Sequence, residues 1–226
     1  MADVEKIFTS IGGTFITPFN DLKNKAKKIK AFVFDWDGVF NNGSKTSDKG
    51  SPFAEPDAMG MNMLKLDYRL RNDSLPYTFI ITGENNQPAL DLAKREHMDA
   101  VFLSYINKSM ALDIICEKYG LRTDEIAFVF DDILDIEVAK RVGIAILVNR
   151  SGSPLTTDYL ISGKVCDYVT GNTGGNFAVR EACELLIGLA GDMEKTIDTR
   201  IRFKGDYENY LAERNLKETE LYRYKK

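Results

Sequence analysis

The stretch AFVFDWDGVF, residues 31–40, decides the fold of this chain. Its apolar first four residues predict a buried strand, and the Asp-Gly pair at 37–38 predicts a turn directly after it. Asp35 and Asp37 therefore stand at the C-terminal end of a strand, where open α/β sheets bind their ligands. Because two neighbouring carboxylates repel each other, we expect a bound cation or a raised pKa here. A strand followed by an ordinary Asp-Gly turn is the alternative explanation of this stretch taken alone.

The composition is that of a soluble globular protein. The 226 residues are 44% hydrophobic and 28% charged, and the net charge is −4. No basic region offsets this charge, so we expect no nucleic-acid partner. The three cysteines are too widely spaced for a disulfide framework or a zinc site, which favours a reducing compartment. No apolar run reaches the roughly 18 residues of a membrane span. We therefore expect a cytoplasmic protein without a membrane partner.

Strand-like apolar segments alternate with helical ones along most of the chain. The expected strands are 31–35, 77–81, 100–103, 127–130, 144–148 and 165–169, and the expected helices are 2–11, 18–30, 58–71, 87–97, 108–118, 136–141 and 177–189. This alternation predicts a three-layer α/β fold, in which a Rossmann-like parallel sheet carries helices on both faces.

Three parts of the chain are expected to differ in structure. Residues 1–17 are predicted to form an N-terminal helical extension and residues 18–190 the central α/β domain. Residues 191–226 are predicted to form a charged, helical C-terminal tail, which packs on a neighbouring subunit or frays. Residues 38–57 hold glycines and prolines without helical periodicity, so we expect a small hairpin insert there and no cap domain.

Polar residues follow the ends of four predicted strands. They are Asp35 and Asp37, then Thr82, then Lys108, then Asp131, Asp132 and Asp135. In a parallel sheet these side chains converge on one edge. Carboxylates from two strands make an all-oxygen site that suits Mg²⁺. A hydroxyl and an ammonium suit a phosphoryl group, so the set predicts phosphoryl transfer through an aspartyl-phosphate.

This ordered set resembles the haloacid dehalogenase superfamily over roughly residues 25–190. The resemblance rests on DWDGV at 35–39, ITG at 81–83, Asn107-Lys108 and DDxxD at 131–135. Within the superfamily, the short insert after Asp37, the FxxxDxxG pattern at 53–60 and GGNFAVRE at 174–181 resemble the capless branch of 3-deoxy-octulosonate 8-phosphate and nonulosonate 9-phosphate phosphatases.

The resemblance implies a role for each residue of the set. Asp35 is the nucleophile and Asp37 the general acid and base. Mg²⁺ is held by the Asp35 side chain, the Asp37 backbone carbonyl and Asp131. Asp132 and Asp135 orient the metal's water shell and Lys108. Thr82, Gly83 and Lys108 bind the phosphoryl group. The branch further implies a homotetramer, in which residues 44–56 of a neighbouring subunit cover the active site.

Three positions depart from the family pattern. Phe130 replaces the usual glycine before the Asp-Asp pair, where a bulky residue crowds the metal loop. Glu84 replaces the arginine of octulosonate enzymes, and Pro56-Asp57-Ala58 replaces Arg-Asp-Gly. Glu84 and Asn85 are therefore candidates for substrate specificity. The predicted function is Mg²⁺-dependent hydrolysis of a phosphorylated sugar acid, either octulosonate 8-phosphate or a nonulosonate 9-phosphate.

Two other functions are weighed against this one. Phe130 and the charged tail favour a catalytically weak or inactive protein of the same fold with an assembly or regulatory role, whereas retention of both Asp35 and Asp37 opposes it. A response-regulator receiver domain also uses Asp, Mg²⁺ and Lys. Its acidic pair ends the first strand, however, and here the pair at 131–132 comes late, so the order is wrong.

Overall fold

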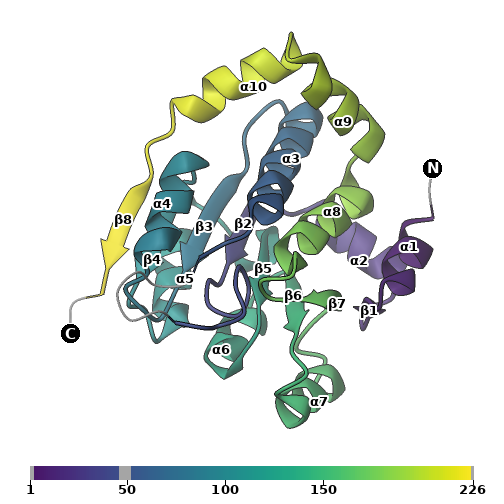
Figure 1. Cartoon of the computed structure of the whole chain (residues 1–226), viewed down its shortest axis with the longest axis vertical. Helices are drawn as coiled ribbons and strands as arrows, with labels where there is room; N and C mark the ends of the chain where they lie inside the picture. Colours follow the sequence, from purple (N-terminus) through teal and green to yellow (C-terminus); the bar gives the residue numbers. More distant parts are fainter. Residues whose placement is uncertain (1–2, 46–51, 225–226) are drawn as a thin grey trace.

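We describe a computed structural model of the chain over residues 3–45 and 52–224. In this part of the chain, an eight-stranded sheet has the order β1-β7-β6-β5-β2-β3-β4-β8 (Figure 1). Neighbouring strands are parallel except β1, which is antiparallel to β7. The strands are β1 (Thr14–Phe15), β2 (Ala31–Phe34), β3 (Tyr77–Ile81), β4 (Ala100–Leu103), β5 (Ile126–Phe130), β6 (Ile144–Asn149), β7 (Tyr168–Thr173) and β8 (Glu220–Arg223).

Helices cover both faces of the sheet (Figure 1). On one face, α1 (Val4–Ser10), α2 (Phe19–Ala26), α3 (Glu55–Asn72), α4 (Gln87–Arg95) and α8 (Ala178–Ala190) share one apolar core. On the other face, α5 (Lys108–Tyr119), α6 (Ile136–Ala139) and α7 (Pro154–Ser162) share a second. Strand β2 supplies Phe32 and Phe34 to the first core and Ala31 and Val33 to the second, as alternation along a strand requires. The predicted three-layer α/β fold is confirmed.

Two elements of the central region differ from the sequence prediction. The strand expected at 165–169 begins at Tyr168, because the Asp167 carboxylate accepts the backbone N–H of Ala145 at 2.8 Å and replaces a ladder contact there. Helix α7 was not predicted, since its residues show little separation of polar and apolar faces. Pro154, which is favourable in the first turn of a helix, marks its beginning.

The segment after residue 190 folds back onto the same domain. Its helices α9 (Met193–Arg202) and α10 (Asp206–Asn215) continue past α3, and the hydroxyl of Tyr210 donates to the Asn62 carbonyl at 3.2 Å (Figure 1). Strand β8 then pairs in parallel with β4, from Glu220 opposite Ala100 onward. The expectation of a frayed tail is therefore wrong for the described residues, and the helical character holds only for α9 and α10. Packing of this segment on a neighbouring subunit stays a prediction.

The insert after β2 is described in part. Residues 38–45 and 52–54 contain no strand. Residues 46–51 of the predicted hairpin at 44–56 lie outside the described residues. Helix α3 starts three residues before the predicted 58, with Pro56 in its first turn. Among the described helices, none combines the length and apolarity that crossing a membrane requires.

Candidate active site

Two adjacent strands bring the acidic residues of the site together. Strands β2 and β5 pair in parallel, and the Asp35 N–H donates to the Val129 carbonyl at 2.9 Å. Asp35 directly follows β2, and Asp131 directly follows β5. A 3₁₀ turn at Ile133–Asp135 then places Asp135 beside them. The sequence prediction that these carboxylates meet at one sheet edge is met for Asp35, Asp131 and Asp135, whose nearest oxygens lie within 4.8 Å of one another.

These three carboxylates are buried, and burial disfavours their charged forms. It raises the pKa of Asp35 to about 7, an effect that Lys108 opposes and Asp131 reinforces. It likewise raises the pKa of Asp135 to about 7 and that of Asp131 to about 6, in each case reinforced by a neighbouring carboxylate. The cluster therefore holds more negative charge than its surroundings neutralise.

Lys108 supplies the buried cation of the cluster. At the start of α5, its Nζ donates to Asp35 Oδ1 at 2.6 Å and to Asp135 Oδ1 at 2.5 Å. Burial opposes the charged ammonium, but the two carboxylates outweigh it and raise the pKa of Lys108 above its ordinary value. One ammonium among three carboxylates leaves a deficit of positive charge that suits a divalent cation with oxygen ligands.

Arg150 is a second cation at the edge of the cluster, and no sequence pattern predicted it. Its Nη1 lies 2.8 Å from Asp131 Oδ2, an ion pair without hydrogen-bond geometry, and 2.9 Å from Asp132 Oδ2. Asp132 is half exposed and caps the following turn through Ile133 N, so it lies outside the buried cluster. Arg150 follows β6, next to β5 in the sheet, and only the sheet order reveals this.

The Asp37 carboxylate has different partners from the other three. Its Oδ2 accepts from Asn86 Nδ2 at 2.8 Å and lies 3.8 Å from Lys45 Nζ. Lys45 also pairs with Glu84 at 3.3 Å, so one exposed lysine links two predicted site residues. The printed partners of Asp37 thus differ from those of the buried cluster, which agrees with separate chemical roles for Asp35 and Asp37.

The turn after β3 carries the predicted phosphate-binding residues. Thr82 is fully buried, and its Oγ1 accepts from Asn86 Nδ2 at 2.9 Å and from Glu84 N at 3.2 Å. Gly83 and Glu84 line the cavity above the carboxylates. Asn85 is exposed and accepts from Arg223 Nη1 at 2.8 Å, so it meets the C-terminal strand at the side of the site.

Phe130 does not crowd the metal loop. Its ring is fully buried in the core beneath α5–α7 and stacks on Phe128, with 5.6 Å between ring centroids. The space beside Asp131 is instead fixed by Gly38, which has a φ of +85° and would place a Cβ 2.0 Å from Asp131 Oδ2. The concern that Phe130 raised in the sequence is therefore not supported by its packing.

A buried glutamate supports the loop that backs the site. Glu181 on α8 accepts the hydroxyl of Tyr168, the backbone N–H groups of Gly171 and Asn172 and the side-chain amide of Asn172, all at 2.7–2.8 Å. This loop continues to Gly174, where a Cβ would meet the Gly38 carbonyl at 1.9 Å. The glycine-rich motif before α8 therefore fixes the turn that carries Asp37.

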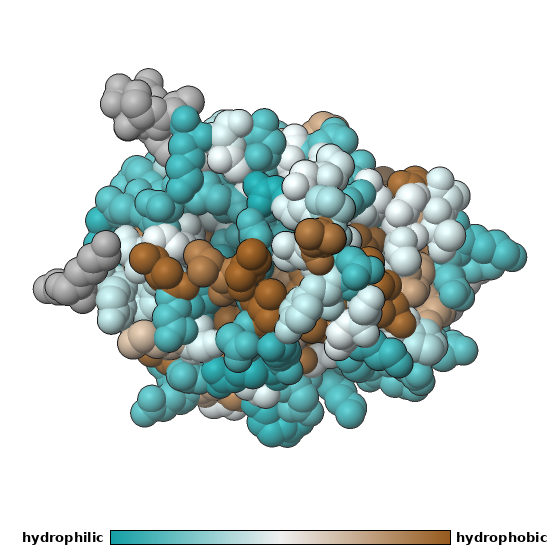
Figure 2. Space-filling view, turned by 90° about the horizontal axis from the view of Figure 1, so that it is seen from below, coloured by the Kyte–Doolittle hydropathy of each residue, from teal (hydrophilic) through white to brown (hydrophobic). Residues whose placement is uncertain are grey.

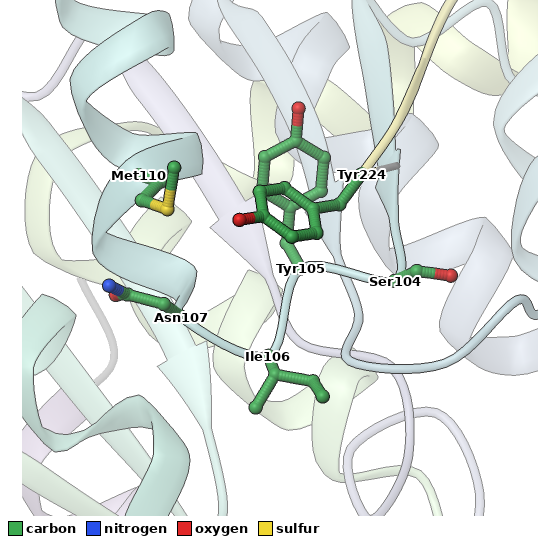
Figure 3. Close-up of a pocket in the computed structure, with 6 residues that line it drawn as sticks. All are labelled: Ser104, Tyr105, Ile106, Asn107, Met110 and Tyr224. Carbon is green, nitrogen blue, oxygen red and sulfur yellow. The ribbon is translucent and has the colours of Figure 1, made fainter. Parts of the chain in front are cut away.

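The site opens to solvent through a cavity of about 580 Å³. Its floor holds Asp35, Lys108, Asp131 and Asp135, and its rim includes the exposed apolar side chains of Ile106, Ile133 and Leu134. Figure 2 shows this end of the molecule, where hydrophobic side chains gather among hydrophilic ones. A smaller cavity of about 240 Å³ lies alongside, with Tyr105 and Tyr224 at one wall and Met110 and Asn107 at another (Figure 3). Ile106 borders both cavities.

Comparisons with known proteins show which proteins this chain is similar to. No protein-family model matches the chain. The 3-deoxy-D-manno-octulosonate 8-phosphate phosphatase KdsC of Escherichia coli is 27% identical over 180 residues, which cover 77% of this chain and 88% of that protein. The enzyme of the same name from Salmonella typhi is 27% identical over 175 residues, covering 76% and 86%.

Solved structures of a phosphatase and of a related hydrolase are also similar to this chain. The 3-deoxy-D-manno-octulosonate 8-phosphate phosphatase of Moraxella catarrhalis, in complex with magnesium, phosphate and KDO, has a TM-score of 0.67 and 29% identity, covering 80% of this chain and 98% of that chain. A HAD superfamily (subfamily III A) hydrolase from Legionella pneumophila has a TM-score of 0.68 and 27% identity, covering 81% and 95%. The resemblance predicted from the sequence is confirmed, and with it the enzyme class, a phosphomonoester hydrolase of the haloacid dehalogenase type.

Proposed function

We propose that this haloacid dehalogenase-type phosphatase hydrolyses a phosphorylated sugar acid, with Mg²⁺ as cofactor and an aspartyl-phosphate on Asp35 as intermediate. The observation that carries the proposal is the contact of Lys108 with a buried Asp35 on the floor of an open cavity. A carboxylate that attacks an anionic phosphate needs a fixed positive charge next to it, and Lys108 supplies one at 2.6 Å.

Two carboxylates have separate roles in this mechanism. Asp35 attacks phosphorus, and the bond to the leaving alcohol breaks as the bond to Asp35 forms. Asp37 gives a proton to the leaving oxygen and later takes one from the water that hydrolyses the aspartyl-phosphate. Lys108 stays paired with Asp135 at 2.5 Å, so its ammonium remains aimed at the reacting oxygens throughout.

The residues present fit a divalent cation. Asp35 and Asp131, together with the Asp37 backbone carbonyl, would hold it, and the surplus of buried negative charge favours its binding. When bound, the cation offsets charge on the transferred phosphoryl group. Magnesium is the metal we propose, because the donors are oxygens without histidine or cysteine.

The substrate class follows from the likeness to the octulosonate phosphatases. We propose a 2-keto-3-deoxy sugar acid, either octulosonate 8-phosphate or a nonulosonate 9-phosphate. Glu84 on the rim favours the second, since it brings a carboxylate, paired with Lys45, to the position where octulosonate enzymes carry arginine. Asn85 is the other specificity candidate.

A homotetramer in the cytoplasm completes the proposal. The cavity is open and has an apolar rim of Ile106, Ile133 and Leu134, which supports cover by a neighbouring subunit. The cysteines are all unpaired, which supports a reducing compartment. Light scattering of the purified protein measures the mass, and a monomer would contradict this part.

Phosphate release from a panel of sugar-acid and hexose phosphates tests the function. We expect turnover with Mg²⁺, loss of turnover with a chelator, and a preference for sugar acids. A covalent phosphate on the Asp35 peptide after acid quenching, found by mass spectrometry, tests the intermediate. The matched control for a substitution of Asp35 is Asp113→Asn, which changes an exposed aspartate on α5 that pairs with Arg141.

The outcomes separate the levels of the proposal. Preference for hexose phosphates would contradict the substrate class and leave the chemistry standing. Absence of turnover with every ester in Mg²⁺ would contradict the phosphatase itself. Turnover without any phosphorylated peptide from Asp35, in a quench that captures a known aspartyl-phosphate, would contradict the intermediate.

A further inference from the structure

Asn86 lies buried between two residues of the candidate site. It is 3% exposed, and its Nδ2 donates to Asp37 Oδ2 at 2.8 Å and to Thr82 Oγ1 at 2.9 Å. A carboxylate only accepts hydrogen bonds, so the amide must present its NH₂ group to Asp37. Both N–H bonds of the Asn86 side chain are thereby donated to residues that follow β2 and β3 in the chain.

Helix capping does not account for this asparagine. Asn86 occupies the N-cap position of α4, where an asparagine ordinarily accepts a backbone N–H of the first turn. Its side chain makes no such bond. The side chain is instead directed at the acidic turn of a different strand, which is the observation that sets it apart from an ordinary cap.

We propose that Asn86 is a positioning residue, which holds the Asp37 carboxylate where it can give a proton to the leaving oxygen. This inference rests on the proposed function. Thr82, fully buried, anchors the amide from one side, so Asn86 ties a loop carboxylate to the sheet. An ion pair of Asp37 with the half-exposed Lys45, at 3.8 Å, gives much weaker geometric control.

The chemistry of the leaving group makes this role measurable. When an alkyl phosphate is cleaved, the P–O bond breaks as the oxygen takes a proton from Asp37, which becomes a carboxylate. A p-nitrophenolate leaves as a stable anion and needs no proton. Misplacement of Asp37 therefore slows transfer from alkyl esters to Asp35 and spares transfer from the aryl ester, whereas general damage to the site slows both. Hydrolysis of the aspartyl-phosphate, in which Asp37 takes a proton from water, is the same for the two esters, so the comparison uses kcat/KM, which reports only the steps through departure of the alcohol.

The experiment compares kcat/KM for p-nitrophenyl phosphate and for the sugar-acid phosphate that the wild type hydrolyses best. We expect Asn86→Ala to lower kcat/KM for the sugar ester by about 10–100-fold, part of the roughly 10²–10⁴-fold that proton transfer contributes. The aryl ester should lose less than about 3-fold on the same basis. Asn86→Asp, which keeps the shape but places a carboxylate against Asp37, should show the same bias. Gln87→Ala is the control, because that exposed amide bonds only Asp91 within α4.

A double-mutant cycle with Asp37→Asn tests whether the effect passes through Asp37. In that background Asn86→Ala should leave the ratio of the two kcat/KM values unchanged, because the proton donor is already lost. Equal loss of both esters in Asn86→Ala, or a bias that persists in the Asp37→Asn background, overturns the inference while the phosphatase stands.

Crystal structures decide the matter independently of turnover. In Asn86→Ala the Asp37 carboxylate should leave the position it has in the wild type, whereas the Gln87→Ala structure should keep it. An unmoved Asp37 in Asn86→Ala overturns the inference even if the wild type hydrolyses no ester, an outcome that would separately contradict the proposed function.

Discussion

Two buried carboxylate sites in this molecule are built in opposite ways. Glu181 is a single carboxylate that accepts four short hydrogen bonds from fixed donors on β7. The cluster of Asp35, Asp131 and Asp135 gathers three carboxylates around one buried ammonium, that of Lys108. The first site is saturated and therefore structural, whereas the second lacks positive charge and is suited to a cation and to chemistry.

The largest expected effect is on turnover. Asp35→Asn should lower kcat by about 10⁴-fold or more, because it removes the nucleophile. Thermal stability should stay the same or rise, since a repelled buried carboxylate becomes neutral. Phosphate release and the unfolding midpoint measure the two. Substantial activity in Asp35→Asn would remove the nucleophile assignment.

The pH dependence of stability should follow from the cluster when no divalent cation is bound. The pKa values of Asp35 and Asp135 are raised to about 7 in the folded state, from about 4 in an unfolded chain. The folded state then binds more protons over this interval, so stability is highest below it and should fall by roughly 2–4 kcal/mol as the pH rises through it. Urea unfolding in chelator between pH 5 and 8 measures this.

Two substitutions serve as controls for the pH experiment, one within the cluster and one on the surface. Asp35→Asn should flatten the slope, because it removes one of the titrating groups. Asp113→Asn, on the surface of α5, should keep it. Stability that increases with pH in the wild type would show that the cluster is not short of positive charge.

Breaking the saturated site should affect stability instead. Glu181→Gln should cost about 2–3 kcal/mol of unfolding free energy, because a single amide oxygen cannot accept four hydrogen bonds and leaves buried donors unpaired. Chemical unfolding measures it, with Glu184→Gln as control, at a half-exposed glutamate of the same helix that pairs with Arg180. Loss of activity without loss of stability would place Glu181 in the chemistry and remove the contrast.

The smallest expected effect is that of metal on stability. Mg²⁺ at about 100 times its Kd should stabilise the wild type by about 2.7 kcal/mol, by binding the folded state. A thermal scan with and without chelator measures the shift, which Asp35→Asn should abolish and Glu181→Gln should retain. A Mg²⁺ shift that survives Asp35→Asn would place the metal elsewhere.

The sequence located the reacting residues because they depend on local pattern. An apolar strand followed by Asp, by Thr or, a few residues later, by Lys is visible in a short stretch of sequence. Parallel pairing of the strands then brings Asp35, Lys108 and Asp131 together. The contacts of Asn86 and Arg150 depend on where their side chains point after two loops have folded. No short stretch of sequence contains that information. Glu181 was not distinguishable from a surface glutamate of a helix until β7 was placed beside it.

The fold shows the same division. The central strands were predicted because their apolar residues are consecutive, whereas β8 is a short ELYR segment that follows the charged helix α10. Its pairing joins residues 100–103 to residues 220–223, and such long-range contacts have no local signature. The short β1, with two residues, was missed for the same reason.

The outermost strands also bear on how the protein is made. Strand β8 covers the β4 edge and β1 covers the β7 edge, so the first and last strands in the sequence flank a sheet built from the middle of it. During translation the β4 edge stays unpaired until residue 223 has left the ribosome. An unpaired edge is a template for aggregation, so products cut short before β8 should be the insoluble fraction of an expression culture.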